Sequence, residues 1–353
     1  MKKKLTAFCA VIALIFALTG CDASSSLKQS SSDDGNTSTT TYKLGISAYP
    51  AFYTWYIAEA EGFFEKNGIN VELVYFPVYS DSVQAFSTGR LDMLSLAMPD
   101  VIAPFISGIE LETVLVLDNS FGADGLVANS SINSIADLKG KSIATEYGTI
   151  EHFFLLSALQ TAGLTESDIN FVNLSISDSA PAYLSDKVDA ACLWEPSLSL
   201  ALEKEGSNLL ISSEDTPGLI PDVLIVDGKM AKNAASDIEK IINAYYDSME
   251  FYVANEDKAI QDMATGAEIT FDEMKVSMSG SKLFTLQEGI DTMDNAADDY
   301  SYLPYTTAKI AEFLKGVKMI DEIPADTTKI VNSKYMRNVL ETRPSLPVPN
   351  TKK

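Results

Sequence analysis

The chain has 353 residues and a formal net charge of −23, with 49 Asp and Glu against 26 Lys and Arg. This acidic balance argues against nucleic-acid binding, which needs a basic surface. A single histidine and three cysteines cannot supply the clusters that common metal sites and Cys-His nucleophiles require, and no GxSxG, Walker or GxGxxG motif occurs. We therefore expect no catalytic residue, no metal and no cofactor.

The N-terminus predicts a secretory signal peptide over residues 1–20. Three lysines precede an uncharged apolar run at 5–18, which is shorter than the roughly 20 residues of a membrane-spanning helix. The run ends at Leu18-Thr19-Gly20-Cys21, which resembles the lipobox of bacterial lipoproteins, so Cys21 is expected to carry the lipid. An ordinary signal peptide with an incidental cysteine is the alternative. Under either alternative the mature chain is expected to be extracytoplasmic, and under the lipobox interpretation it is also anchored in the cell membrane.

Residues 21–41 follow as a segment of mostly Ser, Thr, Asp, Asn and Gly, which predicts a flexible tether without a core. A chain of about 20 such residues spans on the order of 25 Å. The remaining chain is long enough for two domains or lobes. Cys192 is the only cysteine in it, so no internal disulfide can form.

The folded part alternates short apolar runs with helical patterns, and glycine repeatedly stands where a helix hands over to the next strand, as at Gly68, Gly89 and Gly163. This rhythm predicts parallel sheets. After residue 226 it gives way to helices, expected at 235–255, 257–265 and 306–315, and a proline-rich surface tail at 343–349. Parallel sheets bind ligands at the carboxyl ends of their strands. The loops there are expected at 48–54, 78–81, 97–100, 118–124, 145–152, 175–180 and 193–197.

Several segments in the right order resemble the nitrate/sulfonate/taurine branch of periplasmic solute-binding proteins, which also includes thiamine-pyrimidine-like members. The resemblance extends over residues 44–226, about half of the chain. Asp186 stands where the family usually has glycine, and it can adopt the same left-handed conformation. The matching segments are AEAEGFFEKNGINVE at 58–72, AFSTGRLD at 85–92, DLKGKSIA at 137–144, GTIEHF at 148–153 and VDAACLWEP at 188–196.

The resemblance implies an α/β fold of the type II periplasmic binding protein class. Two lobes, each a mostly parallel sheet flanked by helices, are joined by two crossover strands, with the ligand between them. We place lobe I at 42–126 plus 224–353 and lobe II at 127–223, with crossings at 126–128 and 224–226. The resemblance also implies a monomeric solute-binding subunit of an ABC importer. It would capture a small organic nitrogen- or sulfur-containing solute by hinge closure and pass it to a membrane permease and its ATPase.

Candidate ligand-binding residues follow from the strand ends together with the resemblance. For most of them packing, capping or turn formation is the alternative. His152 is expected to be packed more than ligating, and Phe52 is assigned to the core. In the first lobe the candidates are Tyr49, Tyr53, Trp55, Ser80, Met98, Asp100, Asp118 and Asp124. In the second lobe they are Gly148, Thr149, Glu151, His152, Asp178, Trp194, Glu195 and Asp222.

Two cues about the solute disagree. The family favours an anion such as a sulfonate, whereas the candidate loops carry Asp and Glu without Lys or Arg, and an uncompensated carboxylate near a buried anion is costly. We therefore predict a neutral or amine-bearing organic solute. Two other functions stay open. One is a ligand sensor that serves a receptor, and the other is an enzyme like the pyrimidine synthases, whose cysteine-rich motif this chain lacks.

Overall fold

The computed structural model describes residues 40–349, which contain two mixed sheets flanked by helices. In the first sheet β1 is parallel to β2 and β3, β10 is antiparallel to β3 and β4, and β11 is antiparallel to β4. Its order is β11 (Ser281–Leu283), β4 (Leu111–Ser120), β10 (Pro221–Asp227), β3 (Met93–Ala97), β1 (Thr41–Ser47) and β2 (Asn70–Phe76).

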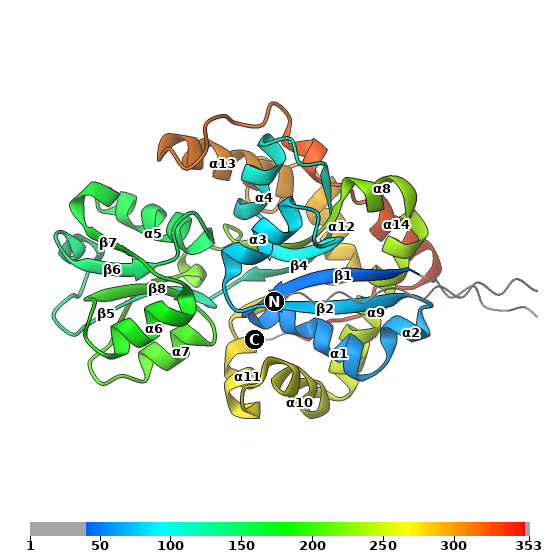
Figure 1. Cartoon of the computed structure of the whole chain (residues 1–353), viewed down its shortest axis with the longest axis horizontal. Helices are drawn as coiled ribbons and strands as arrows, with labels where there is room; N and C mark the ends of the chain where they lie inside the picture. Colours follow the sequence, from blue (N-terminus) through cyan, green and yellow to red (C-terminus); the bar gives the residue numbers. More distant parts are fainter. Residues whose placement is uncertain (1–39, 350–353) are drawn as a thin grey trace, which may run out of the picture. The chain divides into compact units, whose positions relative to one another are not determined.

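In the second sheet β6 is parallel to β7 and β8, and β5 is antiparallel to β8 and β9. Its order is β7 (Asn170–Asn173), β6 (Ser142–Thr145), β8 (Ala190–Trp194), β5 (Asp124–Ala128) and β9 (Asn208–Ser212). Three helices accompany it, on the left of Figure 1. They are α5 (Ile150–Thr161), α6 (Ile176–Leu184) and α7 (Ser197–Leu202).

The other helices accompany the first sheet, which the C-terminal third of the chain completes (Figure 1). They are α1 (Trp55–Ala60), α2 (Phe63–Lys66), α3 (Tyr79–Ser87), α4 (Pro99–Ile106), α8 (Gly228–Asn233), α9 (Ala235–Ala254), α10 (Glu256–Ala267), α11 (Phe271–Met278), α12 (Leu286–Asp294), α13 (Leu303–Gly316) and α14 (Lys334–Thr342). Short 3₁₀ turns are η1 (Pro50–Thr54), η2 (Ile135–Leu138), η3 (Glu166–Asp168), η4 (Ser213–Asp215) and η5 (Thr327–Ile330).

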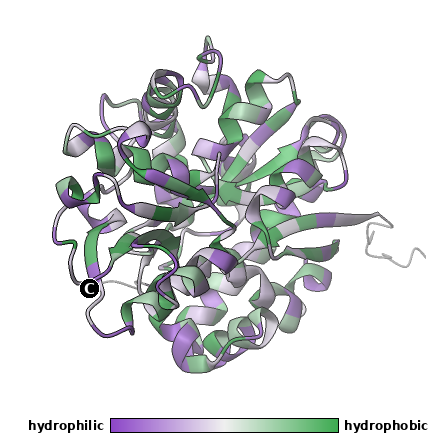
Figure 2. Ribbon diagram, turned by 60° about the vertical axis from the view of Figure 1, so that its left-hand side comes forward, coloured by the Kyte–Doolittle hydropathy of each residue, from purple (hydrophilic) through white to green (hydrophobic). Residues whose placement is uncertain are grey.

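The central strands form the cores of both sheets. Every residue of β3 and of β8 is buried, as expected for strands covered on both faces. Figure 2 shows many hydrophobic residues in the interior strands, whereas hydrophobic and hydrophilic residues alternate along the surrounding helices. The helix-to-strand turns form as predicted at Gly68 and Gly89, where φ is 69° and 70°. Asp186 takes the left-handed conformation at φ 57°, and its carboxylate accepts from Lys204 Nζ at 2.6 Å.

The chain passes from the first sheet to the second between Ser120 and Asp124, and returns between Ser212 and Pro221. The crossings predicted at 126–128 and 224–226 are wrong, since these residues lie inside β5 and β10. The error arose because an apolar run predicts a strand but not the sheet that the strand joins. Ser213 ties the two crossings together: its Oγ accepts from Gly122 N at 2.7 Å and lies 2.6 Å from Ser120 Oγ.

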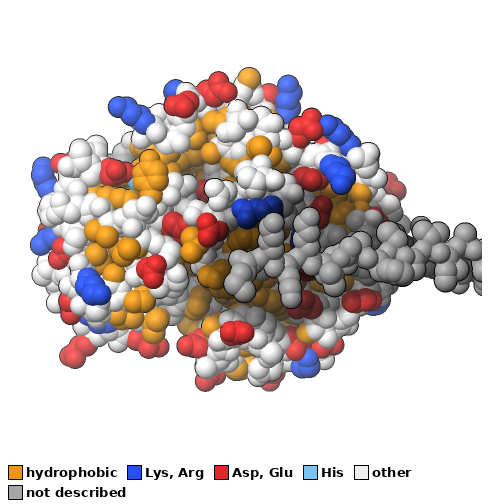
Figure 3. Space-filling view, viewed as in Figure 1, with side chains coloured by type: hydrophobic (Ala, Val, Ile, Leu, Met, Phe, Trp, Pro, Cys, Tyr) orange, Lys and Arg blue, Asp and Glu red, His pale blue; other side chains and the backbone are white. Residues whose placement is uncertain are grey.

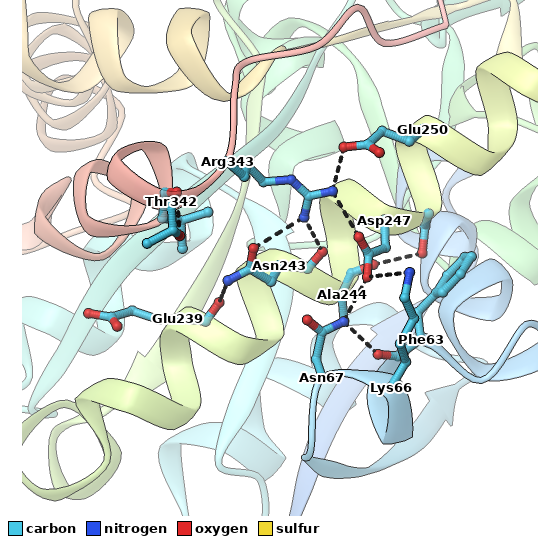
Figure 4. Close-up of polar contacts among 12 residues, drawn as sticks. Phe63, Lys66, Asn67, Glu239, Asn243, Ala244, Asp247, Glu250, Thr342 and Arg343 are labelled. Atoms are coloured by element: carbon cyan, nitrogen blue, oxygen red, sulfur yellow. Dashed lines mark hydrogen bonds and ion pairs between the residues drawn. The ribbon is translucent and has the colours of Figure 1, made fainter. Parts of the chain in front are cut away.

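The C-terminal segment is held to the first sheet's helices by Arg343. Its guanidinium donates to the Asn243 carbonyl at 2.8 Å and to Asp247 Oδ1 at 2.8 Å, and it pairs with Glu250 (Figure 4). The helices predicted after residue 226 are present as α9, α10 and α13. Within residues 40–349 no helix is both long and apolar enough to cross a membrane. The predicted signal peptide, Cys21 and most of the tether at 21–41 lie outside the described residues.

Candidate ligand-binding cleft

The carboxyl ends of the parallel strands in both sheets face one another, as the strand-end rule predicts. The lobe of the first sheet contributes residues that follow β1 and β2, the end of β3 and the start of the antiparallel strand β10. The lobe of the second sheet contributes the start of β5, a residue that follows β6 and the end of β8. They enclose a cavity of about 10 Å³, which has room for about one water molecule. Its lining is Tyr49, Phe52, Tyr79, Ala97, Asp124, Ile150, Trp194, Ile220 and Asp222.

Aromatic rings form two walls of this inner cavity. Tyr49 and Phe52, which follow β1, have their ring centroids 5.0 Å apart. Tyr79 at the start of α3 meets Trp194 at the end of β8 edge-to-face, with centroids 5.2 Å apart. The second pair brings together residues from the two sides, so part of the cleft is closed by direct aromatic contact.

Two carboxyl groups of the first sheet lie at this cavity: Asp222 lines it, and Asp118 lies beside it. Asp118 and Asp222 face each other as cross-strand partners in β4 and β10, and their exposed fractions are 0% and 2%. Burial raises the pKa of Asp118 to about 7. Burial, followed by the negative charges of Asp118 and Asp124, raises the pKa of Asp222 well above its ordinary range. Tyr49 donates its hydroxyl to Asp118 Oδ2 at 3.3 Å.

A second acidic pair lies on the opposite side. Asp124 and Glu151 are 1% and 0% exposed. Burial raises the pKa of Asp124 to about 6, and burial followed by the charge of Asp124 raises the pKa of Glu151 well above its ordinary range. Asp124 accepts a hydrogen bond from Ser120, and the Cys192 thiol donates to Glu151 Oε2 at 3.0 Å. Two buried carboxyl pairs therefore lie close to the inner cavity.

Two hydrogen bonds cross the cleft directly. Asp100 Oδ2 accepts from the Ile150 backbone N–H at 3.0 Å, so a carboxylate on α4 caps the first residue of α5. Asp100 also accepts from the Tyr79 hydroxyl at 2.8 Å, and burial raises its pKa to about 7. On the same edge Ser80 N donates to Glu146 Oε1 at 3.0 Å.

A larger cavity of about 420 Å³ lies at this edge, between α3 and α4 on one side and the start of α5 on the other. This volume falls within the usual range for small-molecule sites. Four of the predicted candidates line it, namely Ser80, Asp100, Gly148 and Thr149. Tyr79 lines both cavities, so its ring lies at the boundary between them.

The sixteen predicted ligand-binding residues do not all lie at one cavity. Tyr49, Asp124, Trp194 and Asp222 line the inner cavity, and Asp118 and Glu151 lie beside it in the buried carboxyl pairs. Trp55 and Tyr53 pack inside the first lobe instead. The indole of Trp55 donates to Ser95 Oγ at 2.9 Å, and Tyr53 stacks on Tyr56 with centroids 6.0 Å apart.

The remaining candidates have local structural partners. Met98 is fully buried, with its N–H bonded to the Pro221 carbonyl at 2.9 Å. His152 is packed, as expected: its Nδ1 accepts from Gly148 N at 3.2 Å and its Nε2 lies 2.7 Å from Glu166 Oε2. Glu195 accepts from Ser199 N and Oγ at the start of α7. Asp178 is exposed and bonds to Ser175 Oγ.

Sequence reasoning missed several residues of the cleft. Tyr79 and Glu146 stand in loops that were correctly placed at strand ends, so the loop positions were informative although these side chains were not chosen. Phe52 was assigned to the core, yet it is both buried and part of the cavity lining. Ile220 and Ser213 belong to the returning crossing, for which the sequence carries no periodic signal.

No cationic side chain balances the buried carboxylates. Among the ion pairs of the described residues, none includes Asp100, Asp118, Asp124, Glu151 or Asp222. The same part of the chain has no group of three or more His, Cys, Asp or Glu arranged to hold a metal ion. Elsewhere acidic and basic groups both lie on the surface, as the face in Figure 3 shows.

A model of the family described as NMT1/THI5 like matches residues 49–259, which include both sides of the cleft. The chain belongs to this family. It is 28% identical over 251 residues to the "putative aliphatic sulfonates-binding protein" of Bacillus subtilis (strain 168), covering 69% of this chain and 72% of that protein. It is 23% identical over 292 residues to the taurine-binding periplasmic protein of Escherichia coli (strain K12), covering 80% and 88%.

A solved structure agrees in fold. The alkanesulfonate-binding protein SsuA from Xanthomonas axonopodis pv. citri bound to MOPS superposes with a TM-score of 0.70 at 17% identity, covering 83% of this chain and 98% of that one. The predicted family and the two-lobed periplasmic binding fold are therefore confirmed. These relatives are binding proteins by name, so the prediction of a solute-binding protein of this family is confirmed as well.

Proposed function

We propose that this protein captures a small organic solute between its two lobes and delivers it to the membrane permease of an ABC importer. The observation that carries the proposal is that residues of both lobes line one cavity, and that hydrogen bonds such as that from Ile150 N to Asp100 cross the cleft beside it. A solute that contacts both sides favours the closed arrangement, which a permease can distinguish from an open one.

The crossings at 121–123 and 213–220 are the proposed hinge, and each lobe comprises one sheet with its helices. Ser213 links the two crossings, so they would bend together. The inner cavity of about 10 Å³ is far smaller than an organic solute, so binding requires the lobes to separate at least partly. Rotation of the Tyr79 ring would join the inner cavity to the larger one.

The predicted anchor and partners complete this function. A lipid on Cys21 and the tether at 21–41 would hold a monomeric, extracytoplasmic binding protein beside the permease and its ATPase. We propose no enzymatic role, since the aromatic and carboxyl lining of the cleft serves recognition without a nucleophile. Gene deletion distinguishes the importer role from a sensing role, because deletion of a sensor would leave solute uptake intact.

The test is a thermal-shift screen of the purified protein against amines, pyrimidines, sulfonates and nitrate, followed by calorimetry of each hit. Excess ligand at about 100 times its Kd adds roughly 2.7 kcal/mol to stability. The proposal also expects that gene deletion abolishes uptake of the hit. If no solute stabilises the protein and no uptake is lost, the proposal fails.

A further inference from the structure

We propose that the solute bears a positively charged nitrogen group with N–H donors, an ammonium or amidinium, which binds Asp118 and Asp222 on one lobe and Asp124 on the other. This inference rests on the proposed function and specifies the solute class. It requires a cationic nitrogen group and excludes a solute whose only charged group is a sulfonate, the class for which two of the relatives described above are named.

The first observation is a set of unused acceptors at the cavity. Asp222 lines the cavity, it is 2% exposed, and its Oδ2 has no hydrogen-bond partner among the described residues. Asp118 Oδ1 and Glu151 Oε1 are likewise buried without a partner there. Buried acceptors are nearly always paired in folded proteins, and an unpaired one is costly. These oxygens are therefore available to donors from a ligand.

The second observation is the placement of Asp118 directly opposite Asp222. Like charges at facing positions of antiparallel strands destabilise a sheet. The pairing of β4 with β10 does not itself require carboxylates at these places, because the side chains take no part in the backbone ladder, which has a register shift directly after Asp222. A cation bound between the two side chains would remove the repulsion between the carboxylates and would explain why both positions carry Asp.

The walls favour an organic cation over a metal ion or an anion. The rings of Tyr49, Phe52, Tyr79 and Trp194 line the cavity, and aromatic faces attract cationic groups. Metal coordination is disfavoured because no suitable group of three or more ligands exists in residues 40–349. An anion would meet carboxyl groups on both sides without an arginine or lysine to balance it.

Protons can hold this cluster neutral when the solute is absent. Burial raises the pKa of Asp118 to about 7, and it raises the pKa of Asp222 well above its ordinary range. None of the titratable groups that influence the four carboxyls is basic. They are Tyr49, Tyr79, Asp100, Cys192, Glu195 and Tyr245. A solute cation therefore exchanges with protons: the carboxyl O–H bonds break, the protons go to buffer, and the solute N–H groups take their places.

A fragment experiment tests the charge directly. Methylammonium, guanidinium, tetramethylammonium and methanesulfonate salts are compared with sodium chloride at equal ionic strength, by thermal shift of the purified protein. We expect methylammonium or guanidinium to raise the Tm above the sodium chloride value. Methanesulfonate should not, and tetramethylammonium should do so less because it lacks N–H donors. A stabilising methanesulfonate, equal effects of all salts, or a tetramethylammonium effect equal to that of methylammonium would overturn the proposal.

Variants test whether the cationic fragment binds at Asp118 and Asp222. Asp222→Asn and Asp118→Asn keep the side-chain shape and should each weaken binding of the cationic fragment about tenfold to a hundredfold. Asp272→Asn, an exposed acidic residue in the first turn of α11, is the matched control and should leave binding unchanged. Circular dichroism of each variant checks the fold. Unchanged affinity in folded Asp222→Asn and Asp118→Asn overturns the proposed site.

The pH dependence provides a second readout. Because protons compete with the cation, affinity should rise between pH 5 and 7, by up to about tenfold per pH unit for each proton released. Calorimetry in buffers of different ionisation enthalpy should detect that release. An affinity that falls or stays constant over this range contradicts the exchange.

The two proposals can fail separately. A neutral or anionic solute that binds tightly, with affinity unaffected by Asp222→Asn, leaves the capture function intact and overturns the cation site. Cationic fragments that bind as expected, in a protein whose deletion affects no uptake, support the site and refute the importer role.

Discussion

The stability of the solute-free protein should decrease as the pH rises, and Asp118→Asn should remove much of this dependence. An Asp whose pKa is raised by folding binds its proton more strongly in the folded than in the unfolded state. Between the ordinary value of 3.8 and the folded value of about 7, the folded protein therefore holds more protons. Its free energy of unfolding falls across that window and levels off above about pH 7.

The magnitude follows from the size of the shift. One pKa unit corresponds to 1.36 kcal/mol, so a rise from 3.8 to about 7 amounts to on the order of 4 kcal/mol for Asp118. Asp222 shares the same local field, so the two contributions do not simply add. Against a total stability of about 5–15 kcal/mol the loss is large. Replacing the carboxylate by a neutral amide should therefore stabilise the protein by roughly 1–4 kcal/mol at pH 8, and by only about a third as much at pH 5, which lies closer to the ordinary pKa of 3.8.

Urea unfolding at several pH values from 5 to 8 measures this, with fluorescence of Trp55 and Trp194 as the signal. The comparison with Asp118→Asn is needed because His152 acts in the opposite direction. Burial lowers the pKa of its imidazole, so its contribution to stability is lost as the pH falls. A wild-type stability that is flat or rising over this range, or a variant with the same slope as wild type, would refute the reasoning.

Three further outcomes are expected. Tyr79→Phe removes the hydroxyl that bonds Asp100 and the Ala97 N–H, so urea unfolding should show a loss of about 1–3 kcal/mol. Arg343→Ala removes donors from a partly exposed carboxylate pair, and the Tm should fall by a few degrees, less so in high salt. Cys21→Ser should move the protein from the membrane fraction to the soluble fraction after cell disruption. A variant that stays in the membrane fraction would contradict lipid anchoring.

The sequence predicted the fold from signals that are local and periodic. Glycine at helix ends, as at Gly68, and fully apolar strands such as β3 specify an α/β chain whichever sheet each strand joins. Which of the two sheets a strand joins depends on which sheet has a free edge for it to pair with. This is a long-range property, and the sequence carries no periodic pattern that reports it. The crossings were therefore misplaced into β5 and β10.

The cleft was predictable in position but only partly in residues. Strand-end loops pointed to Tyr49, Asp124 and Trp194, all of which line the inner cavity. The same rule could not separate them from Trp55, because the direction of a side chain depends on packing. The indole of Trp55 turns into the lobe, where Ser95 accepts its N–H. Residues of the returning crossing, such as Ile220, had no sequence signal.

The buried carboxyl pairs link stability and function in this protein. Asp118 and Asp222 weaken the folded state increasingly as the pH rises above their ordinary pKa, since a neutral side chain of the same shape would not have to lose its charge on burial. A site that binds a cation needs these charges, and bound solute then restores the stability that they cost. With the proposed cation site, solute binding and lobe closure would be coupled, because the charges from both sides would be compensated only when the lobes meet around the cation. The same coupling would give release a physical basis: a partner that separates the lobes would part the acceptors on one lobe from those on the other.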